Sequence, residues 1–292
     1  MICTRLLAVA IVASAAVPLQ AQQGRDETNF TWSRQLSAGG TLIVRSGNGP
    51  ITVREATGDR VEIRAVKNVR SGGSIRDVAF DIIESDGQIE VCTVYEPQTS
   101  CRGRGSNRNV RVRVDFTVYM PKSSRLRIST GNGALDIDRA GADVSATTGN
   151  GDVNVGETQG RVDVTTGNGD VHVDGANGPV TATTGNGRIF VQTSRGAVDA
   201  NTGNGDVDVR IKAMPIDGDM RFNSGSGTIR VSLPSDYSGR IDASTGNGSL
   251  SSDFEISVLG RLDAQHLRGT IGQGGPLIRM STGNGAIVLR KG

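Results

Sequence analysis

The sequence is poor in the residues on which most globular cores and enzyme sites depend. Aromatic residues make up 3% of its 292 positions, tryptophan occurs once, histidine twice and cysteine three times. This leaves few large side chains for a conventional core and few bases for proton transfer. With 41 glycines, the composition instead favours a narrow repeat architecture filled by small aliphatic side chains.

Long apolar runs are also scarce. The run from Leu6 to Pro18 follows a single positive charge at Arg5 and precedes a short stretch that ends at Ala21. This order predicts a secretory signal peptide over residues 1–21, because the run is too short to span a bilayer stably. We therefore expect an exported chain that is periplasmic, on the cell surface or extracellular, with no transmembrane segment in its mature part.

The tetrapeptide Thr-Gly-Asn-Gly recurs every 18 residues in the middle of the chain. Its first glycines are Gly131, Gly149, Gly167, Gly185 and Gly203. Apolar residues alternate before and after each copy, which predicts two short strands joined by a glycine turn. A period this short indicates a stacked solenoid. The predicted fold is all-β, a parallel β-solenoid (β-helix) with 18 residues per coil.

Each coil is expected to bury its alternating apolar positions and to stack in parallel on its neighbours. In the coil at 161–179 the inward set is Val162, Val164, Thr166, Val171 and Val173. The central asparagines of the turns should form a structural ladder of stacked amides. They are Asn132, Asn150, Asn168, Asn186, Asn204, Asn247 and Asn284. Nothing in their repetition alone makes them ligand residues.

The pattern divides the chain into four expected parts. They are the signal peptide at 1–21, an N-terminal lead-in at 22–40, an irregular N-terminal part of the solenoid at 41–123 with a side hairpin or sheet, and the regular Gly-Asn-Gly solenoid at 124–292. The glycine spacing loosens after Gly203 and reaches 37 residues before Gly283. We expect that gap to hold two more coils, one with Phe254 and Ile256 inside and the next with Leu262.

Two cysteines, Cys92 and Cys101, remain after the predicted signal peptide. In an oxidising compartment this spacing favours a hairpin disulfide. A redox-active pair is the alternative, but the spacing is not Cys-x-x-Cys and no histidine is near in the sequence to lower a thiol pKa.

Charge is unevenly distributed although the total is +2. Residues 25–127 hold 17 Lys and Arg against 12 Asp and Glu, a balance of +5, and residues 128–292 hold 14 against 18, a balance of −4. The densest basic cluster is Arg102, Arg104, Arg108, Arg111 and Arg113. It is the candidate contact for an anionic polymer, and a solvated strand edge protected by charge is the alternative. A nucleic-acid partner is not expected, because there is no basic-aromatic module.

Other polar columns have structural interpretations. Outward Asp152, Asp170 and Asp206 resemble a calcium surface, but Arg188 breaks the column and the calcium-binding nonapeptide is not matched. A row of outward threonines suggests ice binding, but charges flank it. His172 and His266 have no recognisable Ser, Cys or Asp companions and are expected at solvated strand positions. We predict no catalytic residues, no metal site and no cofactor.

These features resemble a known family of bacterial exported β-strand-repeat proteins named "putative adhesins", a domain of unknown function related to the auto-transporter adhesin head domain. The resemblance is carried by Ser-Gly-Asn-Gly at 46–49, by the strand that ends at Pro121, and by the Thr-Gly-Asn-Gly series that follows. It implies a right-handed parallel β-solenoid and an envelope location, and it supplies no catalytic residues.

The sequence thus favours a non-catalytic, exported solenoid that acts as an adhesin or an envelope-associated binding scaffold, with an envelope polysaccharide or another surface protein as partner. The first alternative is an envelope-stress or regulatory accessory protein that senses a polymer or peptide. The second is a polysaccharide-active enzyme, since parallel β-helices also occur in lyases and hydrolases. Oligomeric state is not indicated by the pattern.

Overall fold

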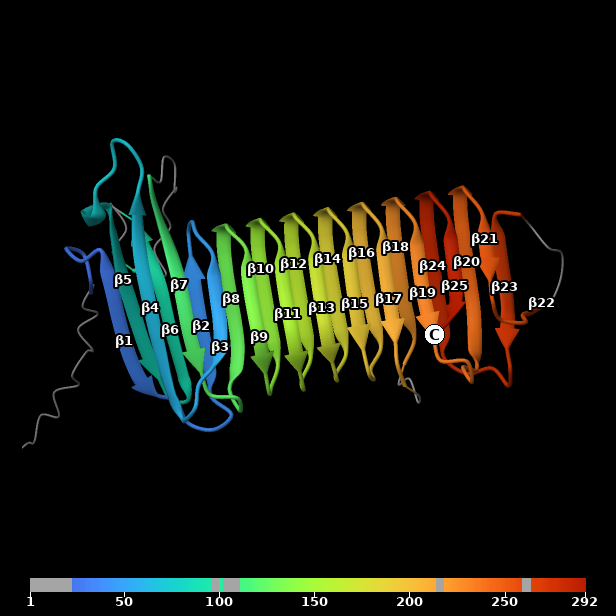
Figure 1. Cartoon of the computed structure of the whole chain (residues 1–292), viewed down its shortest axis with the longest axis horizontal. Helices are drawn as coiled ribbons and strands as arrows, with labels where there is room; N and C mark the ends of the chain where they lie inside the picture. The colour runs from blue at the N-terminus through green and yellow to red at the C-terminus, as the bar shows by residue number, and fades with distance from the viewer. Residues whose placement is uncertain (1–22, 96–99, 102–110, 214–217, 259–263) are drawn as a thin grey trace, which may run out of the picture.

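The computed structural model describes residues 23–95, 100–101, 111–213, 218–258 and 264–292. These residues form a rod of two β-sheets packed face to face, with strands running across the long axis (Figure 1). The all-β solenoid expected from the repeat is confirmed. One short 3-10 helix, η1 (Ile75–Asp77), interrupts the strands. Within the described ranges, no helix is long and apolar enough to cross a membrane.

Sheet A has 13 strands and sheet B has 12. In spatial order, sheet A is β22 (Ser257–Val258), β23 (His266–Ile271), β20 (Gly239–Asn247), β24 (Leu277–Asn284), β18 (Met220–Ser226), β16 (Val198–Asn204), β14 (Val180–Asn186), β12 (Val162–Asn168), β10 (Val144–Asn150), β8 (Arg125–Asn132), β2 (Thr41–Ser46), β6 (Gln88–Tyr95) and β5 (Val78–Ser85). Sheet B is β1 (Asn29–Gln35), β4 (Arg60–Val69), β7 (Val112–Met120), β3 (Ile51–Glu55), β9 (Leu135–Ala140), β11 (Val153–Thr158), β13 (Val171–Ala176), β15 (Ile189–Thr193), β17 (Val207–Ile211), β19 (Ile229–Leu233), β25 (Ile287–Lys291) and β21 (Leu250–Ser252).

A rung is one strand of sheet A followed by the strand of sheet B that comes next in the chain. In the regular region each rung pairs in parallel with the rung 18 residues away, as Val144 with Val162 and Asn150 with Asn168. The aliphatic side chains of both sheets meet between them, and Val162 and Val164 are fully buried. The inward phase expected from the alternation is therefore confirmed.

The N-terminal part closes one end of the rod. The rung β2–β3 stacks directly on β8–β9, and the strands between residues 60 and 120 lie beyond it with several antiparallel pairs. Phe80 stacks on Phe30 with ring centroids 4.4 Å apart and meets Phe116 edge-on at 5.8 Å. Three of the chain's six phenylalanines thus pack together between the sheets at this end of the rod.

A buried lysine ties the strands of this end together. Lys67 is 2% exposed, and its Nζ donates to the carbonyl oxygens of Gly24, Arg25, Ile75 and Val78 at 2.6 to 3.1 Å. Burial lowers the pKa of Lys67 to about 8, and the positive charge of Arg25 adds to this. The four carbonyls replace the water that the ammonium loses.

The disulfide between Cys92 and Cys101 is present, with their Cα atoms 5.8 Å apart. Cys92 lies in β6, and the Cys101 amide donates to the buried carboxylate of Asp81 at 2.9 Å. The predicted pairing of these two cysteines is confirmed.

The expectation that coils follow chain order to the end is wrong. The last rung, β24–β25, inserts between β18–β19 and β20–β21. The described residues 253–258 and 264–271 do not form two further parallel coils, because β22 and β23 are antiparallel and β23 pairs with β20. Leu262 lies outside the described residues. Antiparallel hydrogen bonding covers the edge of β20 and blunts the end of sheet A.

Candidate functional site

The repeated Thr-Gly-Asn-Gly motif forms a structural corner. The buried Thr166 hydroxyl donates to the carbonyl oxygen of Gly151 in the preceding rung at 2.9 Å. A Cβ on Gly167 would lie 2.5 Å from the carbonyl oxygen of Gly149, so no larger residue fits there. Gly169 adopts φ +149°, which L side chains rarely adopt. The motif is therefore explained by the close approach of successive backbones.

The asparagine side chains form an amide ladder on the outside of this corner. Asn168 Nδ2 donates to Asn150 Oδ1 at 2.8 Å, and the same bond recurs from Asn132 to Asn204. A separate bond joins Asn247 to Asn284. The seven asparagines share one column of the sheet, but the amide ladder is interrupted where Ser226 lies between Asn204 and Asn284.

The outward aspartates after each turn hydrogen-bond the next rung. Oδ1 of Asp152 accepts from the Asp170 amide at 2.8 Å, and Oδ1 of Asp206 accepts from the Thr228 amide at 2.8 Å. Burial pushes the pKa of Asp206 upward, but the Thr228 amide and Arg230 outweigh it, so the pKa lies below its ordinary value. These carboxylates thus serve the stacking of rungs.

The predicted arginine cluster is only partly described. Arg102, Arg104 and Arg108 lie outside the described residues. Arg111 donates to the Ser71 carbonyl at 3.2 Å, and Arg113 makes two bonds to Asp115 at 2.7 Å each. The charge of Arg113 is therefore balanced by a carboxylate of its own strand.

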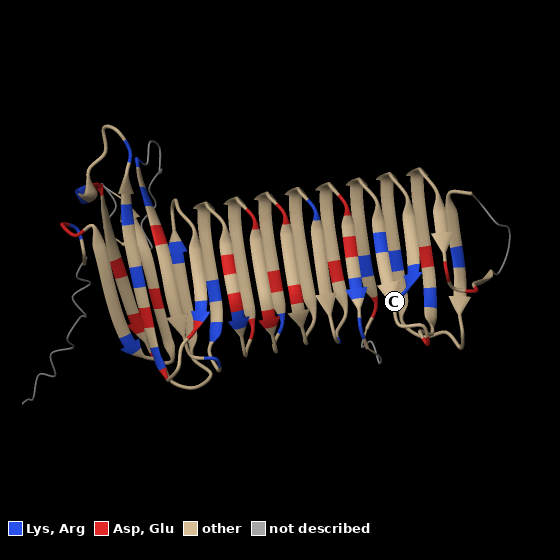
Figure 2. Ribbon diagram, in the orientation of Figure 1, with Lys and Arg blue, Asp and Glu red and all other residues tan. Residues whose placement is uncertain are grey.

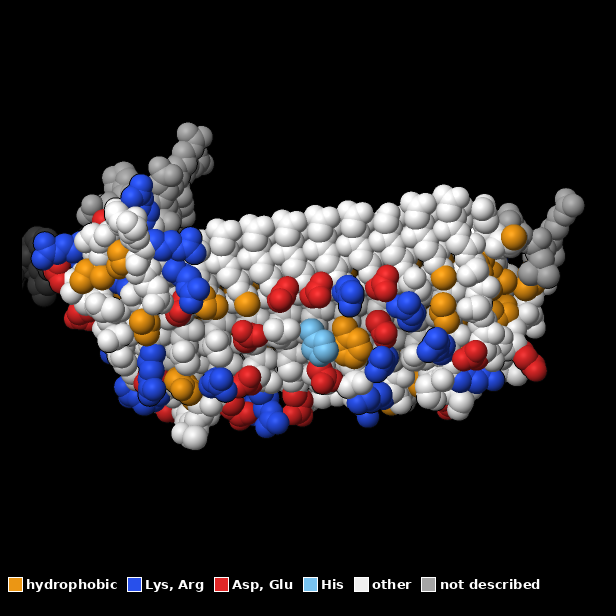
Figure 3. Space-filling model, turned by 45° about the horizontal axis from the view of Figure 1, so that its top comes forward, with side chains coloured by type: hydrophobic (Ala, Val, Ile, Leu, Met, Phe, Trp, Pro, Cys, Tyr) orange, Lys and Arg blue, Asp and Glu red, His pale blue; other side chains and the backbone are white. Residues whose placement is uncertain are grey.

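A different basic surface lies on the outer face of sheet B, toward the C-terminal rungs. It surrounds an open hollow of about 600 Å³ lined by Gln192, Asp208, Arg210, Ile211, Lys212, Arg230, Ser232, Pro234, Ser235, Asp236, Arg290, Lys291 and Gly292. We call this the basic hollow. Its lining contains five basic and two acidic side chains, a surplus of three positive charges. Figure 2 shows basic residues on the strands toward this end of the sheet, and Figure 3 shows basic side chains on its surface there.

The basic groups of the hollow differ in how they are held. Arg210 Nε lies 3.3 Å from Asp208, and Arg230 lies 3.1 Å from Asp206. Within the described part of the chain, Lys212 and Arg290 have no ion pair, so their charges are available to a ligand. An anion that meets these groups would gain charge-assisted hydrogen bonds.

A short aromatic ladder borders the basic hollow. The His172 and Phe190 rings are stacked with centroids 4.6 Å apart, and the Arg210 guanidinium lies 5.1 Å from the centroid of the Phe190 ring. Figure 3 shows the histidine beside a hydrophobic side chain on this face. Since both neighbours contact the Phe190 ring, we assign the ladder the role of positioning Arg210 by a cation–π contact.

The second histidine has an acidic companion, contrary to expectation. His266 Nε2 lies 3.0 Å from Asp242, and Ser244 is its cross-strand partner on β20. Asp242 also accepts from Arg268 at 3.4 Å, and the Ser244 hydroxyl pairs with Ser281 at 3.3 Å. The serine is thus not hydrogen-bonded to the histidine, as nucleophilic catalysis would require.

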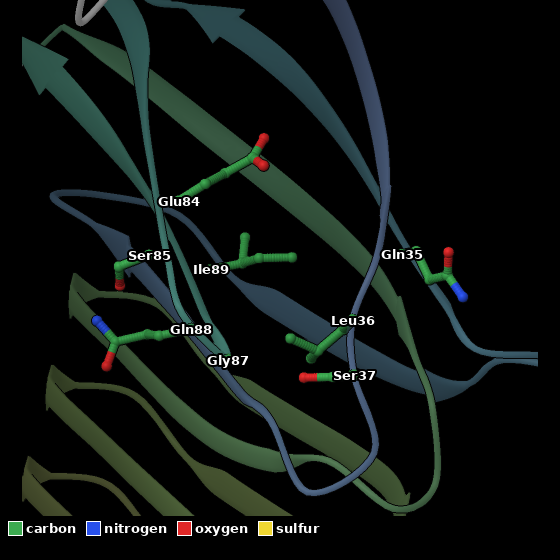
Figure 4. A pocket seen from close by; sticks show the side chains of 8 residues that line it. All are labelled: Gln35, Leu36, Ser37, Glu84, Ser85, Gly87, Gln88 and Ile89. Carbon is green, nitrogen blue, oxygen red and sulfur yellow. The ribbon is translucent and has the colours of Figure 1, made fainter. Parts of the chain in front are cut away.

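A smaller hollow of about 340 Å³ lies near the N-terminal end, between the end of β1 and the β5–β6 turn (Figure 4). Buried Leu36 and Ile89 lie among polar side chains. Glu84 is the one charged residue in the lining, and its Oε2 lies 2.9 Å from Nε of Arg34. This hollow offers little to hold an ion.

Sequence reasoning missed the basic hollow. Its arginines lie on three strands, and residues 128–292 carry a net charge of −4 by sequence count. The alternation of side chains along each strand predicts that these arginines point outward. It does not predict that they lie side by side, because this requires β25 to insert beside β19.

Comparison with known proteins gives one family and several distant structures. The family model Toastrack DUF4097 matches residues 41–290. No curated protein matches the chain. Among solved structures, a "putative cell adhesion protein" from Clostridium sporogenes is 13% identical, with 90% of this chain and 100% of that one covered and a TM-score of 0.27. A "putative adhesin" from Bacteroides fragilis is 10% identical, with 89% and 96% covered and a TM-score of 0.45.

A third structure, a "putative lipid binding protein" from Parabacteroides distasonis, is 12% identical, with 92% and 98% covered and a TM-score of 0.34. At these identities and TM-scores, the likeness carries no argument about function.

Proposed function

The chain belongs to the Toastrack DUF4097 family, and from that premise we propose that it is a non-catalytic binding scaffold whose basic hollow holds an anionic envelope polymer. The rod supplies a rigid, repetitive surface, and the hollow supplies the positive charge. The proposal includes export to the cell envelope, where the disulfide between Cys92 and Cys101 would be stable.

The observation that carries the proposal is the surplus of three positive charges around one open hollow. Lys212 and Arg290 are central to it, since neither has an ion pair among the described residues. A ligand carboxylate or phosphate would find its counter-charge there without breaking an existing pair. Arg210 and Arg230 are already oriented by Asp208 and Asp206, which reduces the ordering cost of binding.

The arginine cluster predicted from the sequence is the competing surface. Of its two described members, Arg113 is paired with Asp115 and Arg111 with a backbone carbonyl. The basic hollow brings together five described basic side chains against these two, which favours it as the principal contact. Both surfaces enter the test.

The absence of a catalytic role is also part of the proposal. Within the basic hollow the lining carboxylates are Asp208 and Asp236. Asp208 is paired with Arg210, which suits a fixed counter-ion better than a proton donor. A glycosidase needs a general acid and a second carboxylate on opposite sides of a bound sugar.

The test is binding to polymannuronate, an acidic polysaccharide, with neutral dextran as the comparison. We expect salt-sensitive binding of polymannuronate and none of dextran. The double variant Lys212→Gln/Arg290→Gln should weaken binding by at least about tenfold, and Arg111→Gln/Arg113→Gln should change it by less than about twofold. The reverse ranking would move the site to the sequence-predicted cluster. Release of new sugar ends from the polymer would overturn the non-catalytic assignment.

A further inference from the structure

Three arginines of the basic hollow lie on three successive strands of sheet B. They are Arg210 on β17, Arg230 on β19 and Arg290 on β25, and these strands are neighbours in that order. Neighbouring strands lie about 4.8 Å apart. The rod therefore carries one guanidinium per rung over three rungs.

The three arginines alternate between two columns. Ser232 is in register with both Arg210 and Arg290, so these two share one column with the serine between them. Arg230 is in register with Asp208 and belongs to the other column. The two columns are two residues apart along each strand, which is about 7 Å. Followed along the rod, the cationic groups form a zigzag.

We propose that the basic hollow binds a linear, extended 1,4-linked polyuronate that runs along the rod axis, with carboxylates of successive sugars paired with Arg210, Arg230 and Arg290. In an extended chain with two-fold symmetry the sugar repeat is close to the rung spacing, and successive carboxylates point to alternate sides. Both properties match the zigzag. This inference rests on the proposed function and names the polymer class.

The neighbouring groups support a chain lying across the strands. Ser232, between Arg210 and Arg290 in its column, offers a hydroxyl to a sugar hydroxyl. Lys212 lines the same hollow and adds positive charge near the β17 end of the track. Asp206 and Asp208 hold two of the three arginines in place. Lys212 and Arg290, which have no ion pair among the described residues, contribute to the net attraction.

Length dependence tests the register of the polymer on the rod. Mannuronate oligomers of one to six sugars are titrated into the full chain by calorimetry at low salt. We expect the dissociation constant to fall at least about tenfold between one and three sugars and to change little beyond four. Equal affinity per mole of sugar at every length would overturn the inference. The proposed function would survive that result as long as long polymannuronate still binds the hollow, and failure of long polymannuronate to bind would remove both.

The variant Arg230→Gln tests the middle contact. It should abolish most of the gain between one and two sugars, because a disaccharide then reaches a single arginine and only a trisaccharide spans Arg210 and Arg290, while its thermal unfolding stays unchanged. Arg54→Gln is the matched control, since Arg54 is an exposed, ion-paired arginine on β3 of the same sheet, and it should leave the length series intact. Equal effects of the two variants would contradict the assignment.

A polymer of different geometry tests whether the shape of the chain matters as well as its charge. Oligoguluronate carries the same charge per sugar but follows a more buckled path, and we expect weaker binding than for mannuronate of equal length. Equal affinity would show that charge alone decides, which would overturn the register. Tighter binding of inorganic polyphosphate than of mannuronate would overturn the polysaccharide assignment.

Discussion

The Thr166 hydroxyl donates a hydrogen bond to the carbonyl oxygen of Gly151, which belongs to the turn one rung earlier, over 2.9 Å. The same bond recurs at the corners of Thr148, Thr184 and Thr202. It gives the Gly151 carbonyl a partner in the next rung, beside the close backbone approach of the glycines, and it explains why the motif begins with threonine.

Replacement of this threonine tests that explanation. Thr166→Val keeps the shape but removes the donor, and we expect the free energy of unfolding to fall by about 1–2 kcal/mol because a part-buried carbonyl loses its partner. Urea unfolding measures the change. Thr165→Val, on the outward side of the same strand, is the control and should alter stability by less than about 0.5 kcal/mol. Similar losses at both positions would refute the role of the hydroxyl.

The glycine corner has its own steric test. Gly167→Ala places a Cβ 2.5 Å from the Gly149 carbonyl oxygen, so rungs must separate and the melting temperature should fall sharply. Gly175→Asn is the comparison, since the nearest atom to a Cβ there is 3.6 Å away and φ is +84°, which asparagine tolerates better than most residues. A melting temperature that falls equally in both variants would argue against close backbone stacking.

The inward phase of the strands is tested by a pair of adjacent positions. Val164→Asp puts a carboxylate at a fully buried site, and we expect it to prevent folding or cost more than about 4 kcal/mol. Asp163→Asn changes an exposed neighbour and should be nearly silent. Circular dichroism and urea unfolding report both, and comparable losses would mean that the phase is wrong.

Lys67 makes the free energy of unfolding depend on pH in the alkaline range. Its pKa of about 8 in the folded chain lies below the ordinary 10.5, chiefly because of burial. Between these values the unfolded chain binds more protons, so the free energy of unfolding should rise as pH increases from 8 to 10.5.

The variant Lys67→Met isolates this effect. It should be destabilised overall, because four carbonyls lose their donor, and the gap between wild type and variant should widen across that pH window. Urea unfolding at several pH values measures it. A gap that narrows with rising pH would mean that the carbonyls hold the ammonium more strongly than burial opposes it.

Much of the regular region followed from local pattern alone. The alternation of Val162 and Val164 fixed the buried face, and the 18-residue glycine period fixed the register. Both are properties of one repeat and its neighbour. The disulfide was likewise predictable, because Cys92 and Cys101 are separated by 9 positions in the sequence.

The basic hollow could not be predicted from the sequence, and the reason is physical. Its groups come from rungs whose order departs from chain order, since β24–β25 returns to lie between β18–β19 and β20–β21. A charge count by sequence segment therefore pointed to Arg111 and Arg113, whereas three-dimensional neighbours place the surplus beside Arg290.

The most direct test of the account is to observe which arginines contact the polymer. The guanidinium Nε–Hε signals of 15N-labelled protein are followed by NMR as trimannuronate is added, with Arg210, Arg230, Arg290, Arg111 and Arg113 assigned by substitution. We expect saturable shifts at Arg210, Arg230 and Arg290 and none at Arg111 or Arg113. Shifts confined to Arg111 and Arg113, or spread evenly over all arginines, would contradict it.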